Sequence, residues 1–205
     1  ISGNFRRIFF DGSTSGTAPN RDKILSIEQW GSGRVWTSMF KAFEGCSNLV
    51  NNALDIPDLS SATSLGRMFR DATSIGDVTE TGNWNWDTSN INSMNSLFNG
   101  ATSFNKDISG WDTSSVTSRG AMFKDAIAFN QNIGGWVTTA VTQMNSMFAG
   151  ATIFNQNING WDVSSVTTMS TMFRDAVAFN QTLTSWTTTS LTVISNMFRD
   201  ATSFN

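Results

Sequence analysis

The amino-acid sequence predicts an α/β solenoid of about seven coils, each of 25–26 residues with one short parallel strand and one short helix. Three observations predict this fold. A Met-Phe pair recurs at a fixed interval, an apolar stripe of helical period surrounds the pair, and an extended motif from Phe to Trp follows it. One unit has too few apolar residues to close a core alone, so stacked units are expected to build one together.

The Met-Phe pair gives the period of the repeat. The last five copies are separated by 25 residues each, and one coil carries a short insertion around residues 80–84. The Phe residues of the series are Phe43, Phe69, Phe98, Phe123, Phe148, Phe173 and Phe198.

The helix of each coil is predicted around this pair. Val116, Arg119, Met122, Phe123 and Ala126 fall at spacings of three, three, one and three residues, which is the stripe of an amphipathic helix. Ser and Thr residues precede each stripe, as helix N-caps do. A column that holds only Gly or Asp follows the stripe and predicts a helix end or a tight turn with strained backbone. Its members are Gly45, Asp71, Gly100, Asp125, Gly150, Asp175 and Asp200.

The strand of each coil is predicted in the motif FNQNIGGW, residues 129–136, and its copies. Phe129, Ile133 and Trp136 are expected in the core, and the two Gly residues between them form a turn. Strands of neighbouring coils would pair in a parallel sheet with the helices on its other side.

One continuous domain is expected. Residues 1–34 are assigned to an N-terminal cap and the first strand, with a strand at residues 4–10, a loop at residues 11–20 and an extended segment at residues 24–30. Residues 35–205 are assigned to the solenoid repeats. No matching C-terminal cap is visible, so the domain is expected to be truncated at its C-terminal end.

Composition disfavours most catalytic and several binding functions. The chain has no His, no Tyr and one Cys, which leaves no Ser/His/Asp set, no Cys/His pair and no His-based metal cluster. We therefore expect no catalytic residue, no metal and no cofactor. A net charge of −3 argues against nucleic-acid binding, and no apolar run predicts insertion into a membrane.

Two sets of acidic residues are candidate exceptions. Asp107 with Asp112 is the nearest approach to paired catalytic acids, but later copies do not keep the first of them. A calcium site at Asp77, Glu80, Asp87 or Asp112 lacks a recognisable ligand spacing. A carbohydrate-active enzyme is therefore the least favoured function.

The repeat resembles a known family. The segment ILSIEQWGSGRVWTSMFKAFEGCSNL and the later copies of WDTSSVT-x-M-x-x-MF-x-x-A-x-x-FNQ-x-I resemble the bacterial surface-protein repeat of about 26 residues, a relative of the BspA-like leucine-rich repeats. The resemblance implies a leucine-rich-repeat-like solenoid on secreted or surface-anchored bacterial proteins, with related copies in phage or viral proteins. The resemblance implies either a function in adhesion or a function that is not known for the family. It implies no catalytic residues.

A column of asparagines in the extended motif is expected to be structural. Each Asn side chain would bond the backbone of a neighbouring coil and so form a ladder. The ladder residues are Asn105, Asn130, Asn155 and Asn180, and Asn205 continues the column.

The next two columns vary and are the candidate ligand-binding residues. Strict strand alternation would bury the first column, where Lys106 would be costly, so we expect the column to be exposed. The first column holds Lys106, Gln131, Gln156 and Gln181, and the second holds Asp107, Asn132, Asn157 and Thr182.

The favoured function is a non-catalytic binding or adhesion module, extracellular or on a cell surface, or associated with a virion. It would contact a protein or glycan on another cell or surface through the strand face. The alternative is a purely structural spacer or stalk. A regular row of Thr residues, at 117, 142, 167 and 192, is also typical of ice-binding solenoids. Their place at the start of the predicted helix favours helix capping instead. The oligomeric state is left open.

Overall fold

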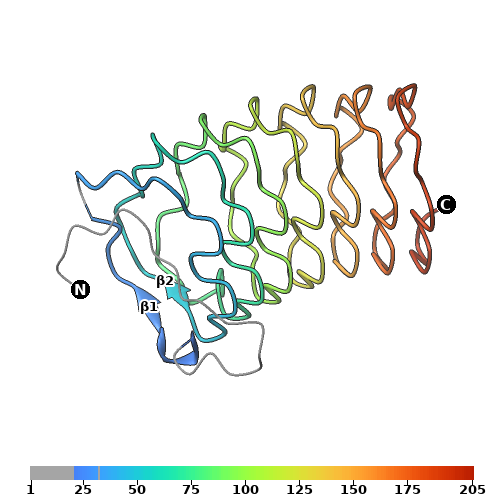
Figure 1. Ribbon diagram of the computed structural model, residues 1–205. Helices are drawn as coiled ribbons and strands as arrows, with labels where there is room; N and C mark the ends of the chain where they lie inside the picture. Colours follow the sequence, from blue (N-terminus) through green and yellow to red (C-terminus); the bar gives the residue numbers. More distant parts are fainter. Residues whose placement is uncertain (1–20, 32) are drawn as a thin grey trace, which may run out of the picture.

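The computed structural model describes residues 21–31 and 33–205. In it the chain forms a stack of coils that lie side by side from the N-terminal to the C-terminal end (Figure 1). The regular elements of the described residues are a 3-10 helix η1 (Arg21–Lys23) and two strands, β1 (Ser26–Ile27) and β2 (Val50–Asn51), which pair in parallel. β1 lies in the extended segment expected at residues 24–30, whereas the strand and loop expected at residues 4–20 lie outside the described residues.

The predicted α/β solenoid with a helix in each coil is wrong. No α-helix forms in the described residues, and the motif around Phe129 is not a strand. Parallel contacts between coils occur instead as single bridges inside the segment predicted to be helical, for example between Ser118 and Gln143. The spacing of three, three, one and three residues reflects consecutive turns, because the N–H of Met122 donates to the carbonyl of Arg119 three residues earlier.

A ladder of backbone hydrogen bonds joins each of these segments to the next coil. The N–H groups of Arg119, Ala121, Phe123 and Asp125 donate to carbonyls of the following coil at distances of 2.7–3.1 Å. At the other described boundaries the equivalent N–H groups that bond across donate in the same direction, whereas just before this ladder the N–H of Thr142 donates back to the carbonyl of Thr117. Bonds between two strands of a parallel sheet run in both directions, so the run of four bonds at residues 119–125, which all point one way, differs from the predicted sheet.

Left-handed residues explain why the segment is not a helix. Ala121 and Asp125 have φ values of 54° and 57°, and the equivalent residues of the other coils are also positive. A positive φ at the third residue of an i to i+3 turn is what a type II turn requires, and it is incompatible with a right-handed helix. The tight turn predicted at the Gly/Asp column is therefore confirmed, and the helix end is not.

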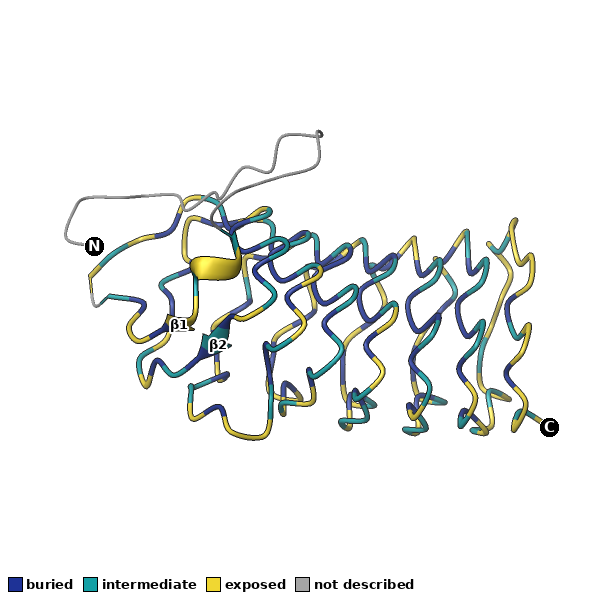
Figure 2. Ribbon diagram, turned by 90° about the horizontal axis from the view of Figure 1, so that it is seen from below, coloured by how far each residue is buried: buried dark blue, intermediate teal, exposed yellow. Residues whose placement is uncertain are grey.

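The core consists of aromatic columns that run along the stack. Seven Phe rings, from Phe43 to Phe198, stack at centroid separations of 5.4–5.8 Å. A second column from Phe104 to Phe204 lies against the first, with Phe123 and Phe129 at 3.8 Å. Trp residues close the core, and the Nε1 of Trp136 donates to the carbonyl of Ile108 in the preceding coil. Each coil therefore buries its apolar side chains mainly against its neighbours. Figure 2 shows that buried residues recur in each coil along the stack.

Candidate binding ribbon of stacked amides

The asparagine column is held together by side-chain to backbone hydrogen bonds between coils. The backbone N–H of Asn130 donates to Oδ1 of Asn105 at 3.0 Å, and the N–H of Asn155 donates to Oδ1 of Asn130 at 2.9 Å. The N–H groups of Asn180 and Asn205 continue the series. Each Asn therefore positions the next one at a fixed register.

The glutamine column reinforces the same contacts. Nε2 of Gln131 donates to both the carbonyl and Oδ1 of Asn105, each at 3.0 Å. Gln156 and Gln181 make the equivalent pair of bonds one coil further on. All three Gln side chains are half-buried. We call these Asn and Gln residues, from Asn105 to Gln181, the amide ribbon.

Half of each amide in the ribbon is left without a protein partner. In the described chain, Nδ2 of Asn130 and Asn155 donates to no protein atom, and Oε1 of Gln131 and Gln156 accepts from none. None of these four atoms is a buried, unsatisfied group. The ribbon therefore presents a donor and an acceptor to solvent in each coil, and both groups are uncharged.

Lys106 occupies the glutamine column in the first coil of the ribbon. Its Nζ donates to the carbonyl of Glu80 at 3.0 Å, so this side chain bonds the insertion and not an Asn. Oε1 of Glu80 accepts from the N–H groups of Asn51 and Gly76 at 2.8 and 2.7 Å. Burial raises the pKa of Glu80, although these backbone donors lower it. The insertion thus fixes the N-terminal end of the ribbon.

The second candidate column lies on the surface beside the ribbon. Asp107, Asn132, Asn157 and Thr182 are all exposed. The Oδ1 atoms of Asn132 and Asn157 each accept from a backbone N–H two residues later, at 3.0 Å. Asp107 makes the same bond to Ser109. The side chains of Asp107, Asn132 and Asn157 therefore hold local turns, and all four residues of the column are exposed beside the amide ribbon.

The four aspartates among the candidate catalytic or calcium-binding residues, Asp77, Asp87, Asp107 and Asp112, each hold a separate local turn. Hydrogen bonds from the side chain and backbone of Ser114 hold the pKa of Asp112 below its usual value, and those from Ser109 do the same for Asp107. Asp77 and Asp87 accept equivalent bonds from Thr79 and Ser89. Among the described residues, no group of three or more His, Cys, Asp or Glu residues is placed to hold a metal ion.

Arg119 and Cys46 are the unusual buried groups. Arg119 replaces Met in its column and is fully buried, and its Nη2 donates to the carbonyls of Thr113 and Val137 at 3.2 and 2.6 Å. Its Nε and Nη1 have no partner in the described chain, and burial lowers its pKa to about 10. Burial raises the pKa of the Cys46 thiol to about 11, so at neutral pH the thiol is protonated.

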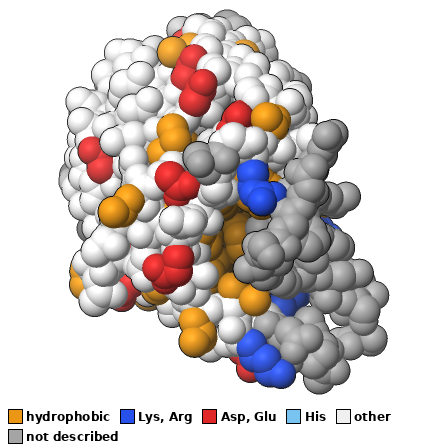
Figure 3. All heavy atoms as spheres, turned by 90° about the vertical axis from the view of Figure 1, so that its left-hand side faces the viewer, with side chains coloured by type: hydrophobic (Ala, Val, Ile, Leu, Met, Phe, Trp, Pro, Cys, Tyr) orange, Lys and Arg blue, Asp and Glu red, His pale blue; other side chains and the backbone are white. Residues whose placement is uncertain are grey.

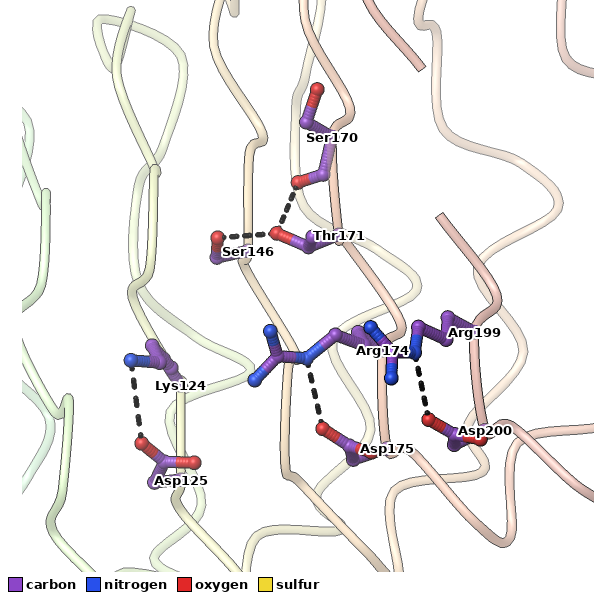
Figure 4. Close-up of polar contacts among 9 residues, drawn as sticks. All are labelled: Lys124, Asp125, Ser146, Ser170, Thr171, Arg174, Asp175, Arg199 and Asp200. Atoms are coloured by element: carbon purple, nitrogen blue, oxygen red, sulfur yellow. Dashed lines mark hydrogen bonds and ion pairs between the residues drawn. The ribbon is translucent and has the colours of Figure 1, made fainter. Parts of the chain in front are cut away.

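Three basic side chains in the C-terminal half of the stack are paired with the carboxylate of the next residue. Figure 4 shows Lys124 with Asp125, Arg174 with Asp175 and Arg199 with Asp200. The nitrogen to oxygen distances are 3.6, 2.9 and 3.1 Å. The pairs are solvent-exposed, so they make a balanced charged rim and not a basic stripe.

The Thr row at residues 117, 142, 167 and 192 has a different structural role from the predicted one. The Oγ1 of Thr142 donates to the carbonyl of Thr117 at 3.4 Å, and that of Thr167 donates to the carbonyl of Thr142 at 3.1 Å. The capping function predicted for these residues is wrong, because no helix follows them. Their hydroxyl hydrogens are used between coils.

A comparison with protein families identifies the family to which the repeats are similar. A model described as "Mycoplasma protein of unknown function, DUF285" matches residues 14–85, 76–162 and 132–205, so three overlapping matches follow the repeats along most of the chain. No curated protein matches the sequence. The described residues contain no helix with the length and hydrophobicity that crossing a membrane requires.

Proposed function

We propose that this chain, which belongs to the DUF285 family of Mycoplasma proteins of unknown function, is a non-catalytic binding module that contacts a ligand through the amide ribbon. The observation that carries the proposal is the repeated pair of unpartnered groups, Nδ2 of each ribbon Asn and Oε1 of the following Gln. Both groups recur in the coils of Asn130 and Asn155, and the ladder holds them at a fixed register.

The ribbon favours an uncharged, repeating ligand. The positions from Asn130 to Asn132 and their copies from Asn155 to Asn157 carry no charge, so an anionic polymer would gain little there. A sugar hydroxyl both donates and accepts, which matches a paired amide donor and acceptor. We therefore favour a glycan, and a protein segment in extended conformation is the second class of ligand.

The fixed register between coils supports multivalent contact. Each ribbon Asn bonds the next at 2.9–3.2 Å, so the groups are held in place before a ligand arrives. A single neutral hydrogen bond contributes about 0.5–1.5 kcal/mol net, and several bonds made at once by a rigid array add in avidity. Preorganisation also lowers the entropy cost of binding.

A surface location for the protein belongs to the same proposal. The resemblance of the repeat to the BspA-like surface-protein repeat supports an extracellular or cell-surface module that meets its ligand on another cell or surface. A structural spacer remains the competing function, and it predicts that the ribbon has no ligand.

Binding to a glycan array tests the proposal. The informative variant carries Asn130→Asp and Asn155→Asp, because Asp keeps the Oδ1 acceptor of the ladder and removes the Nδ2 donor. A matched control carries Ser115→Asp and Ser165→Asp, which adds the same charge at exposed positions outside the ribbon. We expect the parent and the control to bind the same glycans and the ribbon variant to lose them. A parent that binds neither the glycan array nor a peptide array would favour the spacer, and equal binding by all three proteins would place the contact elsewhere.

A further inference from the structure

Two Asn-Gly pairs occur in the sequence, Asn99-Gly100 and Asn159-Gly160. Asparagine is a thermolabile residue, and it is most labile before Gly, because no side chain hinders attack of the following backbone nitrogen on the carbon of its amide. This attack needs a nitrogen that is free of other hydrogen bonds and able to turn toward the Asn side chain. The two pairs differ in this respect because they lie at different places in the coil.

The peptide between Asn99 and Gly100 is part of the backbone ladder between coils. The N–H of Gly100 donates to the carbonyl of Lys124 in the following coil at 2.7 Å. The carbonyl of Asn99 accepts from the N–H of Asp71 in the preceding coil, also at 2.7 Å. Freeing the nitrogen of Gly100 therefore requires contacts between coils to open, and the fold protects Asn99.

The peptide between Asn159 and Gly160 lies instead in an exposed turn. The turn is closed by the N–H of Trp161, which donates to the carbonyl of Ile158 at 3.1 Å. Gly160 is exposed, and neither its N–H nor the carbonyl of Asn159 has a hydrogen-bond partner among the described residues. Gly135, at the same place one coil earlier, is exposed as well. The nitrogen of Gly160 is therefore available without any change in the ladder.

The side chain of Asn159 forms a bridge to the next coil that is easily opened. Its Oδ1 accepts from the N–H of Ser185 at 2.9 Å, and its Nδ2 donates to Oγ of Ser185 at 3.0 Å. Ser185 is exposed, so opening of these two bonds is a local event that leaves the ladder intact. Release of this side chain thus costs less than release of the nitrogen of Gly100.

We propose that Asn159-Gly160 is a self-modification site at which the folded protein loses the side-chain amide of Asn159. The nitrogen of Gly160 attacks Cγ of Asn159 and forms a new C–N bond. The bond from Cγ to Nδ2 breaks, and Nδ2 leaves as ammonia with the proton of the Gly160 N–H. Water then opens the cyclic imide at either carbonyl and gives Asp or isoaspartate at position 159. The reaction needs no oxidant, and it is independent of the proposed function.

The reaction replaces a hydrogen-bond donor by a negative charge at a coil boundary. Nδ2 no longer donates to Ser185, and isoaspartate lengthens the backbone of the turn at residues 158–161. Charged residues are only 14% of the chain, and on the face shown in Figure 3 they lie scattered among uncharged ones. The product adds one negative charge to a net charge of −3, so ion exchange separates it from the unmodified protein.

Peptide mapping by mass spectrometry, after incubation of the folded protein in mildly alkaline buffer, tests the proposal. We expect Asn159 to convert at least about tenfold faster than Asn99, because only the nitrogen of Gly160 is free of the ladder. In guanidinium chloride, where both pairs lose their contacts, the two rates should agree within about threefold. Circular dichroism of the incubated sample verifies that the protein stays folded in the first experiment.

Two Gly→Ala variants separate the chemistry from changes in stability. Gly160→Ala should slow the conversion of Asn159 by at least about tenfold, because the added methyl group hinders the attack. A Cβ at Gly160 meets nothing within 4 Å, so the fold accepts the change. Gly135→Ala is the matched control, since its Cβ also meets nothing within 4 Å, and it should leave the rate at Asn159 unchanged.

Three results would overturn the proposal. Asn159 could keep its amide in the folded parent and lose it only in guanidinium chloride, Asn99 could convert as fast as Asn159 in the folded parent, or Gly160→Ala could leave the rate at Asn159 unchanged.

Discussion

Arg119 is the residue at which the repeat departs furthest from its own pattern. Its neighbours in the column are Met94, Met144 and Met169, all buried, and its own guanidinium leaves two nitrogens without a partner. Because burial lowers its pKa to about 10, the charged form is disfavoured in the folded state, and the penalty is fully present at every pH below that value. Contact with the Trp136 ring, at 5.3 Å, offsets only part of it.

Replacing this residue by the side chain of its column should stabilise the protein. We expect Arg119→Met to raise the free energy of unfolding by about 1–3 kcal/mol, because it removes a desolvated charge and restores the Met column. Urea denaturation measures the change. The reciprocal substitution Met144→Arg serves as the matched control and should destabilise. A less stable Arg119→Met variant would show that the two carbonyl bonds outweigh the desolvation cost.

The surface aspartates predict a loss of stability in acid. Hydrogen bonds from Ser residues lower the pKa of Asp87, Asp112 and Asp162 in the folded state. A lowered carboxyl pKa contributes stability that is present above the unfolded value, near 3.8, and is lost as the pH falls through the folded value. The melting temperature should therefore drop as the pH falls below about 4, and it should drop less when these three residues are changed to Asn.

Asn is the appropriate replacement for these three aspartates, because Asn132 and Asn157 make the same turn hydrogen bond without a charge. Glu80 acts with the opposite sign, since its raised pKa favours the folded state at low pH and this contribution is lost as pH rises. Both proteins in the comparison keep Glu80, so its contribution cancels. Identical acid curves for the two proteins would contradict the assignment.

At the scale of the repeating element, the sequence predicts the columns but not the backbone. The residues that stack on one another in successive coils could be assigned from the sequence, because apolar and amide residues recur at a fixed period, as at Phe123 and Phe148. The helix was wrong because its apolar spacing also fits consecutive turns that bury the same side chains. Two left-handed positions in each coil distinguish the turns from a helix. The Gly/Asp column marks one of them in the sequence. The other lies four residues earlier, where residue types such as Ala121 and Ser146 do not indicate a positive φ.

The left-handed turns predict which glycines matter. Gly150 has a φ of 73°, and a Cβ there would collide with Oδ1 of Asp125. We expect Gly150→Ala to lower the free energy of unfolding by about 2 kcal/mol, from the left-handed strain and from displacement of the Asp125 side chain. Denaturant unfolding measures the loss.

Gly135→Ala is the matched control in a neighbouring coil. A Cβ at Gly135 meets nothing within 4 Å, so this change should lie within about 0.5 kcal/mol of the parent. Equal effects at the two glycines would contradict the turn geometry.

At the scale of the whole molecule, the stack turns a short sequence pattern into a long regular surface. Each coil contacts mainly its neighbours, so the positions of Asn105, Asn130, Asn155 and Asn180 are set by the same hydrogen bonds that hold the coils in register. The sequence located the amide columns, since they recur in every copy of the motif. It could not predict which amide atoms stay free, because that depends on side-chain rotamers and on the coil boundary.

The measurement that tests the central claim most directly is the affinity of a cumulative series of ribbon variants. Asn130→Asp, Asn155→Asp and Asn180→Asp are introduced one after another, and the dissociation constant is measured for the strongest-binding glycan of the array. If the ribbon binds as a periodic array, each substitution should weaken binding by about three- to tenfold, the effect of one neutral hydrogen bond. An unchanged dissociation constant after all three substitutions would contradict the account.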